Sequence, residues 1–174
     1  VRFIANRSSG KQGYALAQAA IDTGAQVTLI SAPTALTPPV GADVVNVQTA
    51  AEMQDAVLAE IKTADALVMA AAVADFQPVD VAENKLKKRD GIPQITLEAA
   101  PDILLAVTST QLSAGASQSP RSSRPRVVVG FAAESRDLIA NAAEKLKSKN
   151  LDLIIANDIS AKDAGFDVEN NRVT

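Results

Sequence analysis

Residues 127–157, VVVGFAAESRDLIANAAEKLKSKNLDLIIAN, contain the pattern that decides the fold. The stretch begins with an aliphatic run at 127–132 and ends with another at 151–157, and both runs are typical of buried strands. Between them, the residues from about 134 to 149 have the spacing of an amphipathic helix. The residues that we expect this helix to bury on one face are Leu138, Ile139, Ala142 and Leu146. This order of strand, helix and strand predicts parallel strands joined by a helix.

The same alternation continues along the rest of the chain. The other predicted elements are strands at 1–4, 26–31, 43–48, the start of 66–74, and 94–98, and helices at 13–23, 50–63 and 101 to about 110. Thr49 and Glu52 have the spacing of a capping box for the second of these helices. Together these elements predict an α/β fold with a doubly wound, mainly parallel, Rossmann-like sheet and helices on both faces.

In a sheet of this kind, ligands bind beyond the carboxyl ends of the strands, where the strand order switches. We therefore expect the informative residues directly after predicted strands. The polar and small residues at those positions lie at 6–13, 71–75, 131–134 and 157–158.

Composition limits the possible chemistry. A chain of 174 residues is suited to one domain, and with only four Phe and one Tyr its core must be aliphatic. Because the chain contains no Cys and no His, thiol nucleophiles, Ser-His-Asp triads and imidazole catalysis are excluded. The net charge of −3 gives no reason to expect a nucleic-acid partner. No apolar run reaches the roughly 18 residues of a membrane span, so we expect a cytoplasmic protein without a membrane partner.

The segment ANRSSGKQGYALA, residues 5–17, predicts a site for an anion at the start of a helix. The first amide groups of a helix have no partners within it, and the helix dipole favours negative charge there. Serine hydroxyls, two close glycines and Lys11 would complete a phosphate cradle. The spacing is neither that of a Walker A loop nor the full G-x-G-x-x-G of dinucleotide-binding proteins. The alternative is a capped helix with a glycine turn.

Three further segments could contribute to the same site, although each also has a structural explanation. AAAVADF, residues 70–76, could read a base with its backbone while Asp75 holds a metal or a polar group, or it could simply pack closely. KLKKR, within a predicted basic flap at 77–93, could close over a polyphosphate or form a solvated face. Lys145 and Lys149 share one helix face, where cations also interact with the helix dipole. A Ser/Arg/Pro-rich linker at 113–126 is expected to be mobile.

Six ordered segments resemble one known family, the phosphopantothenoylcysteine synthetases. They are VRFIANRSSGKQG, AAAVADF, ENKLKK, PDIL, VGFAAES and KNLDLIIAND, and they extend from residue 1 to about 158. The resemblance implies a phosphopantothenate–cysteine ligase of coenzyme A biosynthesis. In such an enzyme the carboxylate of 4′-phosphopantothenate attacks the α-phosphorus of CTP, and the amine of cysteine then displaces CMP from the acyl-cytidylate. The resemblance also implies Mg²⁺ with the triphosphate, a homodimer, and a covalently linked decarboxylase half.

The resemblance assigns roles to individual residues. Asn6 matches the residue that handles the acyl-nucleotide intermediate, and Lys85 matches a flap lysine that stabilises charge during amide formation; both are the expected catalytic residues. Asn6 and Asn157 are the expected substrate contacts, and Asp75 is the expected contact to the ribose or the metal. The residues at nucleotide-binding positions are Ser8, Gly10, Gly13, Ala70, Ala71, Asp75, Lys85, Pro101, Asp102, Ile103, Leu104, Phe131, Lys145 and Lys149.

Family members carry a further strand and a GGT-like loop before the VRFIAN segment, and more structure after the NNRVT segment. We therefore expect residues 1–174 to be a single synthetase domain trimmed at both ends. Two alternatives remain open: a nicotinamide or flavin oxidoreductase, and a non-catalytic nucleotide-binding module. The first would need an acidic residue at the end of the second strand to bind the ribose, but the segment TLIS ends in Ser31.

Overall fold

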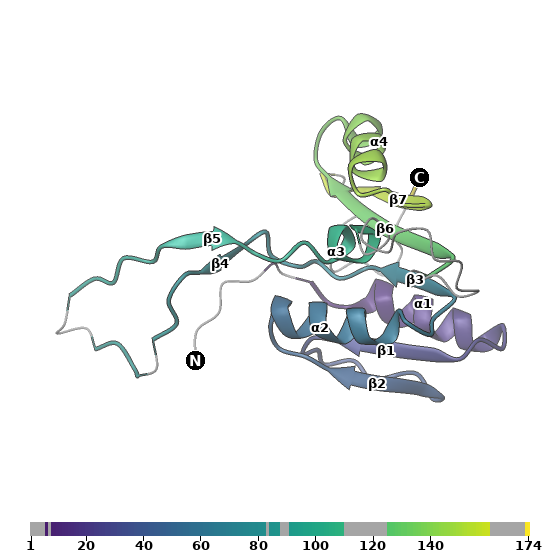
Figure 1. Cartoon of the computed structure of the whole chain (residues 1–174), viewed down its shortest axis with the longest axis horizontal. Helices are drawn as coiled ribbons and strands as arrows, with labels where there is room; N and C mark the ends of the chain where they lie inside the picture. The colour runs from purple at the N-terminus through teal and green to yellow at the C-terminus, as the bar shows by residue number, and fades with distance from the viewer. Residues whose placement is uncertain (1–5, 7, 83, 88–90, 110–124, 161–172) are drawn as a thin grey trace, which may run out of the picture.

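The computed structural model describes residues 6, 8–82, 84–87, 91–109, 125–160 and 173–174. A parallel sheet of three strands lies at its centre, in the order β3 (Ala66–Met69), β6 (Val127–Glu134) and β7 (Leu153–Asp158) (Figure 1). Helix α4 (Leu138–Ser148) connects β6 to β7 and packs against both strands. The strand–helix–strand prediction for 127–157 is therefore confirmed.

A second pair of parallel strands is formed by β1 (Val27–Ser31) and β2 (Ala42–Asn46). Helix α1 (Lys11–Asp22) packs against β1, and helix α2 (Ala50–Glu60) packs against β1 and against α3 (Ile103–Ser109). The predicted α/β class with mainly parallel strands is confirmed.

The predicted capping box at the start of α2 is present. The Thr49 hydroxyl oxygen accepts a hydrogen bond from the Glu52 amide at 3.1 Å, and the Glu52 carboxylate accepts one from the Thr49 amide at 3.3 Å. Amide groups at a helix start have no partners within the helix, so these two bonds satisfy donors that would otherwise depend on water.

The main core lies between α2, α3 and the sheet, and it is built from aliphatic side chains with two methionines. Its buried members are Val47, Met53, Val57, Ile61, Met69, Ile103, Leu104, Val107, Val128 and Leu151. Val107 of α3 and Val128 of β6 are completely buried. A smaller cluster of Ala132, Ala142 and Ala156 lets α4 approach the sheet closely.

The start of α4 differs from the prediction. Strand β6 continues to Glu134, so the helix begins at Leu138 rather than near residue 134. Ala142 is buried, and Leu138 and Leu146 are partly buried, as expected for residues four apart on one helix face. The expectation for Ile139 was wrong, because its side chain is 62% exposed. It follows Leu138 by about 100° of helix rotation and so turns away from the sheet.

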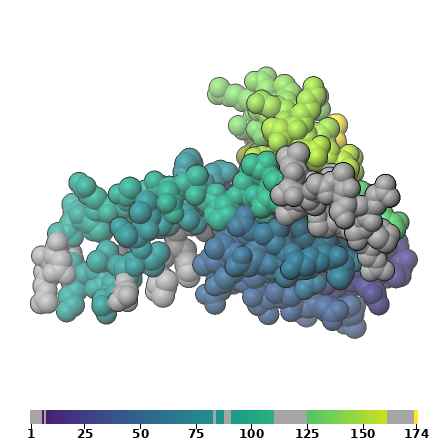
Figure 2. All heavy atoms as spheres, viewed as in Figure 1, coloured from purple at the N-terminus to yellow at the C-terminus, as the bar shows by residue number. Residues whose placement is uncertain are grey.

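The described residues between 76 and 99, namely 76–82, 84–87 and 91–99, belong to a projecting hairpin that we call the arm (Figures 1 and 2). Strands β4 (Phe76–Pro78) and β5 (Leu97–Ala99) pair in antiparallel register, with Phe76 opposite Ala99. The sequence predicted a strand at 94–98, which falls partly on β5, but no partner for it. The predicted flap at 77–93 lies within the arm, except for its residues outside the described part.

Two other predictions fall mainly on undescribed residues: the strand at 1–4 and most of the linker at 113–126. Over the described residues, every helix is too short or too polar to cross a membrane.

Candidate nucleotide-binding site

The turn before α1 is shaped by Gly10, whose φ of +76° lies in the left-handed region that favours glycine. Hydrogen bonds to two serine hydroxyls stabilise this turn. Ser8 Oγ accepts from the Gly10 amide and Ser9 Oγ accepts from the Lys11 amide, each at 3.4 Å. From the loop after β1, the Thr34 hydroxyl donates to the Ser9 carbonyl at 3.1 Å. The predicted anion-binding turn therefore has a defined shape at the helix start.

This turn lies beside the segment that follows β3. The Asn6 amide nitrogen donates to the Val73 carbonyl at 3.1 Å. A Cβ atom built on Gly13 would lie 3.9 Å from Ala70 Cβ, an ordinary contact distance. Two segments separated by about sixty residues in the chain, and predicted independently to share a site, are thus brought together.

Strand register places the predicted residues Ala70, Phe131 and Asn157 along one edge of the central sheet. We call the carboxyl ends of β3, β6 and β7 the sheet edge. Met69 pairs with Gly130, so Ala70 and Phe131 come next on neighbouring strands. Phe131 is in turn opposite Ile155 of β7. Asn157 lies two residues further along β7, and only 6% of its surface is exposed.

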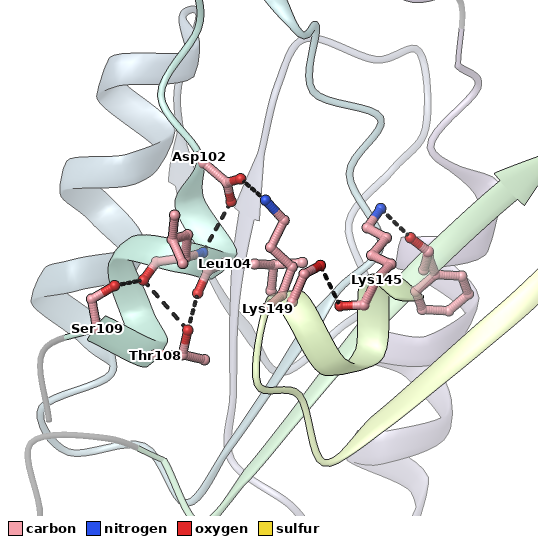
Figure 3. Close-up of polar contacts among 9 residues, drawn as sticks. Asp102, Leu104, Thr108, Ser109, Lys145 and Lys149 are labelled. Atoms are coloured by element: carbon pink, nitrogen blue, oxygen red, sulfur yellow. Dashed lines mark hydrogen bonds and ion pairs between the residues drawn. The ribbon is translucent and has the colours of Figure 1, made fainter. Parts of the chain in front are cut away.

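Lys145 of α4 and Lys149, the residue that follows the last turn of this helix, were both predicted to bind the nucleotide. Lys145 Nζ donates to the Phe131 carbonyl at 2.7 Å, and Lys149 Nζ forms an ion pair with the Asp102 carboxylate (Figure 3). The two ammonium groups are therefore held by acceptors of the chain itself. An anion that binds them must share or replace those acceptors.

Asp102 also begins α3, because its Oδ1 accepts a hydrogen bond from the Leu105 amide at 2.9 Å. Partial burial raises the pKa of this carboxyl group. The hydrogen bonds from Lys149 and Leu105, with the charges of Lys149 and Lys145, lower the pKa more, and the net pKa lies below the ordinary value. The carboxylate is therefore ionised at neutral pH.

The remaining residues of the PDIL segment divide into two kinds. The side chains of Ile103 and Leu104 are only 3% and 7% exposed and belong to the main core. A nucleotide could meet these two residues only through their backbone. Pro101 is partly buried and Asp102 is exposed, so both remain within reach of a ligand.

Two predicted residues are placed differently from the others. Asp75 is at the base of the arm, where its carbonyl accepts from the Ala100 amide at 2.9 Å. Lys85 is exposed and belongs to the segment 84–87, which lies in the chain between β4 and β5. The part of the arm between these two strands projects away from the central sheet (Figure 1). The structure therefore does not bring Lys85 to the sheet edge of its own chain.

Sequence reasoning missed two features. One is the Asp102–Lys149 ion pair, whose partners are 47 residues apart and carry no shared motif. The other is a hydrogen bond of 3.0 Å between the hydroxyls of Tyr14 and Ser31, which ties α1 to the end of β1.

A divalent metal fits this edge only together with a ligand. Within the described residues, no group of three or more Asp and Glu side chains could hold a metal ion. Mg²⁺ commonly binds through one or two carboxylates, water and the phosphates of a substrate. Asp75 could supply one such carboxylate, while a triphosphate would supply further oxygen ligands.

The whole chain, residues 1–174, matches the DNA/pantothenate metabolism flavoprotein C-terminal domain, and it belongs to this family. Among its relatives is the coenzyme A biosynthesis bifunctional protein CoaBC of Bacillus subtilis, which is 44% identical over 175 residues. The protein of the same name from Mycobacterium tuberculosis is 46% identical over 177 residues. These matches cover 100% and 98% of this chain, but only 40% and 41% of the respective relatives.

Solved structures agree with the fold. The crystal structure of a CoaBC C-terminal domain matches with a TM-score of 0.72 and 37% identity, covering 91% of this chain and 69% of the other. The DNA/pantothenate metabolism flavoprotein of Streptococcus pneumoniae matches with a TM-score of 0.73, covering 100% of this chain and 84% of the other. Its identity of 22% supports the fold alone.

Proposed function

We propose that this chain is the phosphopantothenate–cysteine ligase part of a coenzyme A biosynthesis protein, and that it uses CTP. Family membership and 44% identity to proteins named for coenzyme A biosynthesis support the class of reaction. The observation that carries the proposal is a pair of ammonium groups one helical turn apart, that of Lys145 at the Phe131 carbonyl and that of Lys149 at the Asp102 carboxylate. Two cations and a helix start near the end of parallel strands suit a polyphosphate.

The proposed roles of the binding residues follow from their positions. Lys145 and Lys149 bind the triphosphate as point charges. The small residues Ala70 and Ala71 leave the backbone after β3 accessible to the base, and Asp75 contacts the ribose or the metal. The phosphate of a substrate lies at the turn containing Ser8 and Gly10, which the helix dipole makes favourable for an anion. Mg²⁺ carried by CTP would add charge neutralisation at the phosphates.

The proposed chemistry has two steps. The carboxylate of 4′-phosphopantothenate attacks the α-phosphorus of CTP and expels pyrophosphate. The amine of cysteine then attacks the acyl-cytidylate carbonyl, and CMP leaves as the amide forms. Asn6 carries an amide donor that can stabilise negative charge on that carbonyl oxygen, and buried Asn157 offers a second polar group for the substrate. Lys85 would stabilise charge in the second step.

We further propose that the protein is a cytoplasmic homodimer in which the arm reaches the partner's site. Several large apolar side chains along the arm are exposed, which favours burial against another protein surface. They are Phe76, Val79, Val81, Leu86, Ile92, Ile95 and Leu97. In such a dimer, Lys85 in the arm of one chain would act in the nucleotide-binding site of the partner chain. The length of the relatives supports a linked decarboxylase half in the complete protein.

The ligase proposal is tested by pyrophosphate release from the full-length protein that carries this chain. The assay contains 4′-phosphopantothenate and Mg²⁺ with either CTP or ATP, with and without cysteine. We expect multiple turnovers only with CTP and cysteine together, and CMP in equal amount to pyrophosphate. If no pyrophosphate is released with either nucleotide, the protein is not a ligase of this kind. If pyrophosphate is released with ATP but not with CTP, the proposed nucleotide is wrong.

The dimer proposal has its own test, light scattering on the full-length protein after size-exclusion chromatography. Ile95 is 61% exposed in the arm, and Ile95→Glu should shift the protein toward monomer because it places a charge in the proposed interface. Val40→Glu is the matched control, since Val40 is 93% exposed outside the arm. If both substitutions shift the protein toward monomer equally, or if neither does so, the arm is not the interface.

A further inference from the structure

The Asp102 carboxylate connects two elements and is held from both sides. Its Oδ1 accepts from the Leu105 amide at 2.9 Å at the start of α3, and its Oδ2 accepts from Lys149 Nζ at the end of α4. The Lys149 side chain is 26% exposed and that of Asp102 is 40% exposed (Figure 3). Because the hydrogen bond to α3 does not involve the lysine, the carboxylate can keep its place when Lys149 takes another partner.

The charge of Asp102 affects more than one lysine. Lys145 and Lys149 are one helical turn apart, and like charges at this spacing repel. Both ammonium charges act on the Asp102 carboxyl group and help to lower its pKa. The carboxylate therefore neutralises part of the positive charge that this helix face would otherwise offer to an anion.

We infer that Asp102 is an internal counter-ion that competes with the bound polyphosphate for the ammonium group of Lys149. This inference rests on the proposed function, in which Lys149 binds the triphosphate. It makes Asp102 a positioning residue rather than a side-chain contact to the nucleotide. When a polyphosphate binds, Lys149 exchanges the carboxylate for a phosphate oxygen. When pyrophosphate leaves, the carboxylate takes the ammonium group back.

The competition predicts that loss of the charge strengthens polyphosphate binding. Asp102→Asn keeps an oxygen that can cap α3, since Asn is as good a capping residue as Asp. In this variant we expect pyrophosphate to bind about three- to tenfold more tightly at low ionic strength, with a smaller gain in high salt. The KM for CTP should fall, whereas kcat should stay equal or decrease because product leaves more slowly.

The measurement is calorimetric titration of Mg²⁺ and pyrophosphate into the full-length protein. Asp55→Asn, which removes an exposed carboxylate from α2, is the charge-matched control and should leave the affinity unchanged. Asp102→Asn should strengthen binding by less in the Lys149→Met background than in the wild type, because the contested cation is gone and only the charge interaction with Lys145 remains.

Unchanged or weaker pyrophosphate binding in Asp102→Asn overturns the inference. A lower unfolding temperature with unchanged binding has the same meaning, because Asp102 would then serve only as a helix cap. Absence of pyrophosphate binding in both wild type and variant also counts against it. Pyrophosphate release by the wild type with CTP and cysteine decides the proposed function separately, so the two failures can be told apart.

Discussion

Ile103 and Ile92 are the same side chain in opposite surroundings, and they represent two regions of this molecule. Ile103 is 3% exposed within the core beneath the sheet edge, whereas Ile92 is 95% exposed in the arm. The main core holds Ile103, the neighbour of Asp102, and Leu146 near the end of α4 packs against this core, so the positions of Asp102 and of the end of α4 are fixed. The arm has paired strands at its base but few neighbours beyond them (Figure 2). The difference suggests that the sheet edge is prepared within one chain, while the arm acquires its surroundings from a partner.

The largest effect should come from truncating the two isoleucines. Ile103→Ala removes buried methyl and methylene groups and leaves a cavity, so we expect a loss of about 2–5 kcal/mol in the free energy of unfolding. Ile92→Ala should change it by about 0.5 kcal/mol or less, because exposed positions contribute little. Urea unfolding of the two variants measures both values. Similar losses at the two positions in a protein dilute enough to be monomeric would mean that the arm is packed within its own chain. A loss at Ile92 that appears only at dimer-forming concentrations would instead place Ile92 in the proposed interface.

A second test addresses how closely β6 is packed at the residue before Phe131. A Cβ atom on Gly130 would lie 2.6 Å from Leu151 Cδ1 and 3.4 Å from Leu104 Cδ1. Gly130→Ala should therefore reduce the free energy of unfolding by about 1–3 kcal/mol through overpacking.

The control is a second substitution that removes the close contact between the new methyl group and Leu151. Combining Gly130→Ala with Leu151→Val should cost less than the sum of the two single changes, because the shorter side chain leaves room for the new methyl group. A purely additive double variant would show that the contact with Leu151 is not the cause.

A smaller effect is expected from the titration of Asp102. Burial raises the pKa of this carboxyl group, but the hydrogen bonds from Lys149 and Leu105 and the charges of Lys149 and Lys145 together leave its pKa in the folded protein below the ordinary value. The pKa of an Asp carboxyl group in the unfolded chain is about 3.9. Because the pKa of Asp102 is lower than this in the folded protein, its ionised carboxylate stabilises the folded protein above about pH 3.9. This contribution is lost as the pH falls through the pKa of the folded protein. The stability difference between wild type and Asp102→Asn should thus be constant above about pH 5 and shrink below about pH 4.

Urea unfolding of both proteins from about pH 7 down to about pH 2 provides the measurement. Because the carboxylate is partly exposed, solvent screening keeps the effect small. Asp55→Asn, which removes an exposed carboxylate from α2, should not reproduce the pattern. A difference that is independent of pH down to strongly acidic conditions would exclude ionisation of Asp102 as its source.

The sequence predicted what depends on local periodicity and left out what depends on packing. Aliphatic runs and helical spacing were sufficient for β6, α4 and β7, and the spacing of Thr49 and Glu52 for the capping box of α2. The pairing of β4 with β5 was missed because the two strands are very short and the residues between them have no alternating pattern. The exposure of Ile139 was missed because both 138 and 139 have helical spacing to 142 and 146, and only packing against the sheet decides which of the two is buried.

The candidate site shows the same division. The positions of Ser8, Gly10 and Ala70 followed from turn chemistry and from the rule that ligands bind beyond parallel strands. The ion pair of Asp102 with Lys149 could not be predicted, because it exists only when the start of α3 and the end of α4 meet. The placement of Lys85 depends on the direction of the arm, which no local pattern specifies.

The central claim is that the cations of α4 at the sheet edge bind the triphosphate. Its most direct test is calorimetric titration of CTP and Mg²⁺ into the full-length protein and two variants at the end of α4. Lys149→Met removes a cation that pairs with Asp102, whereas Lys147→Met removes an exposed cation of α4 two residues away. We expect Lys149→Met to weaken CTP binding by about tenfold or more, as for a charge-assisted contact, and Lys147→Met to leave it nearly unchanged. Equal affinities in the two variants would contradict the placement of the nucleotide at this edge.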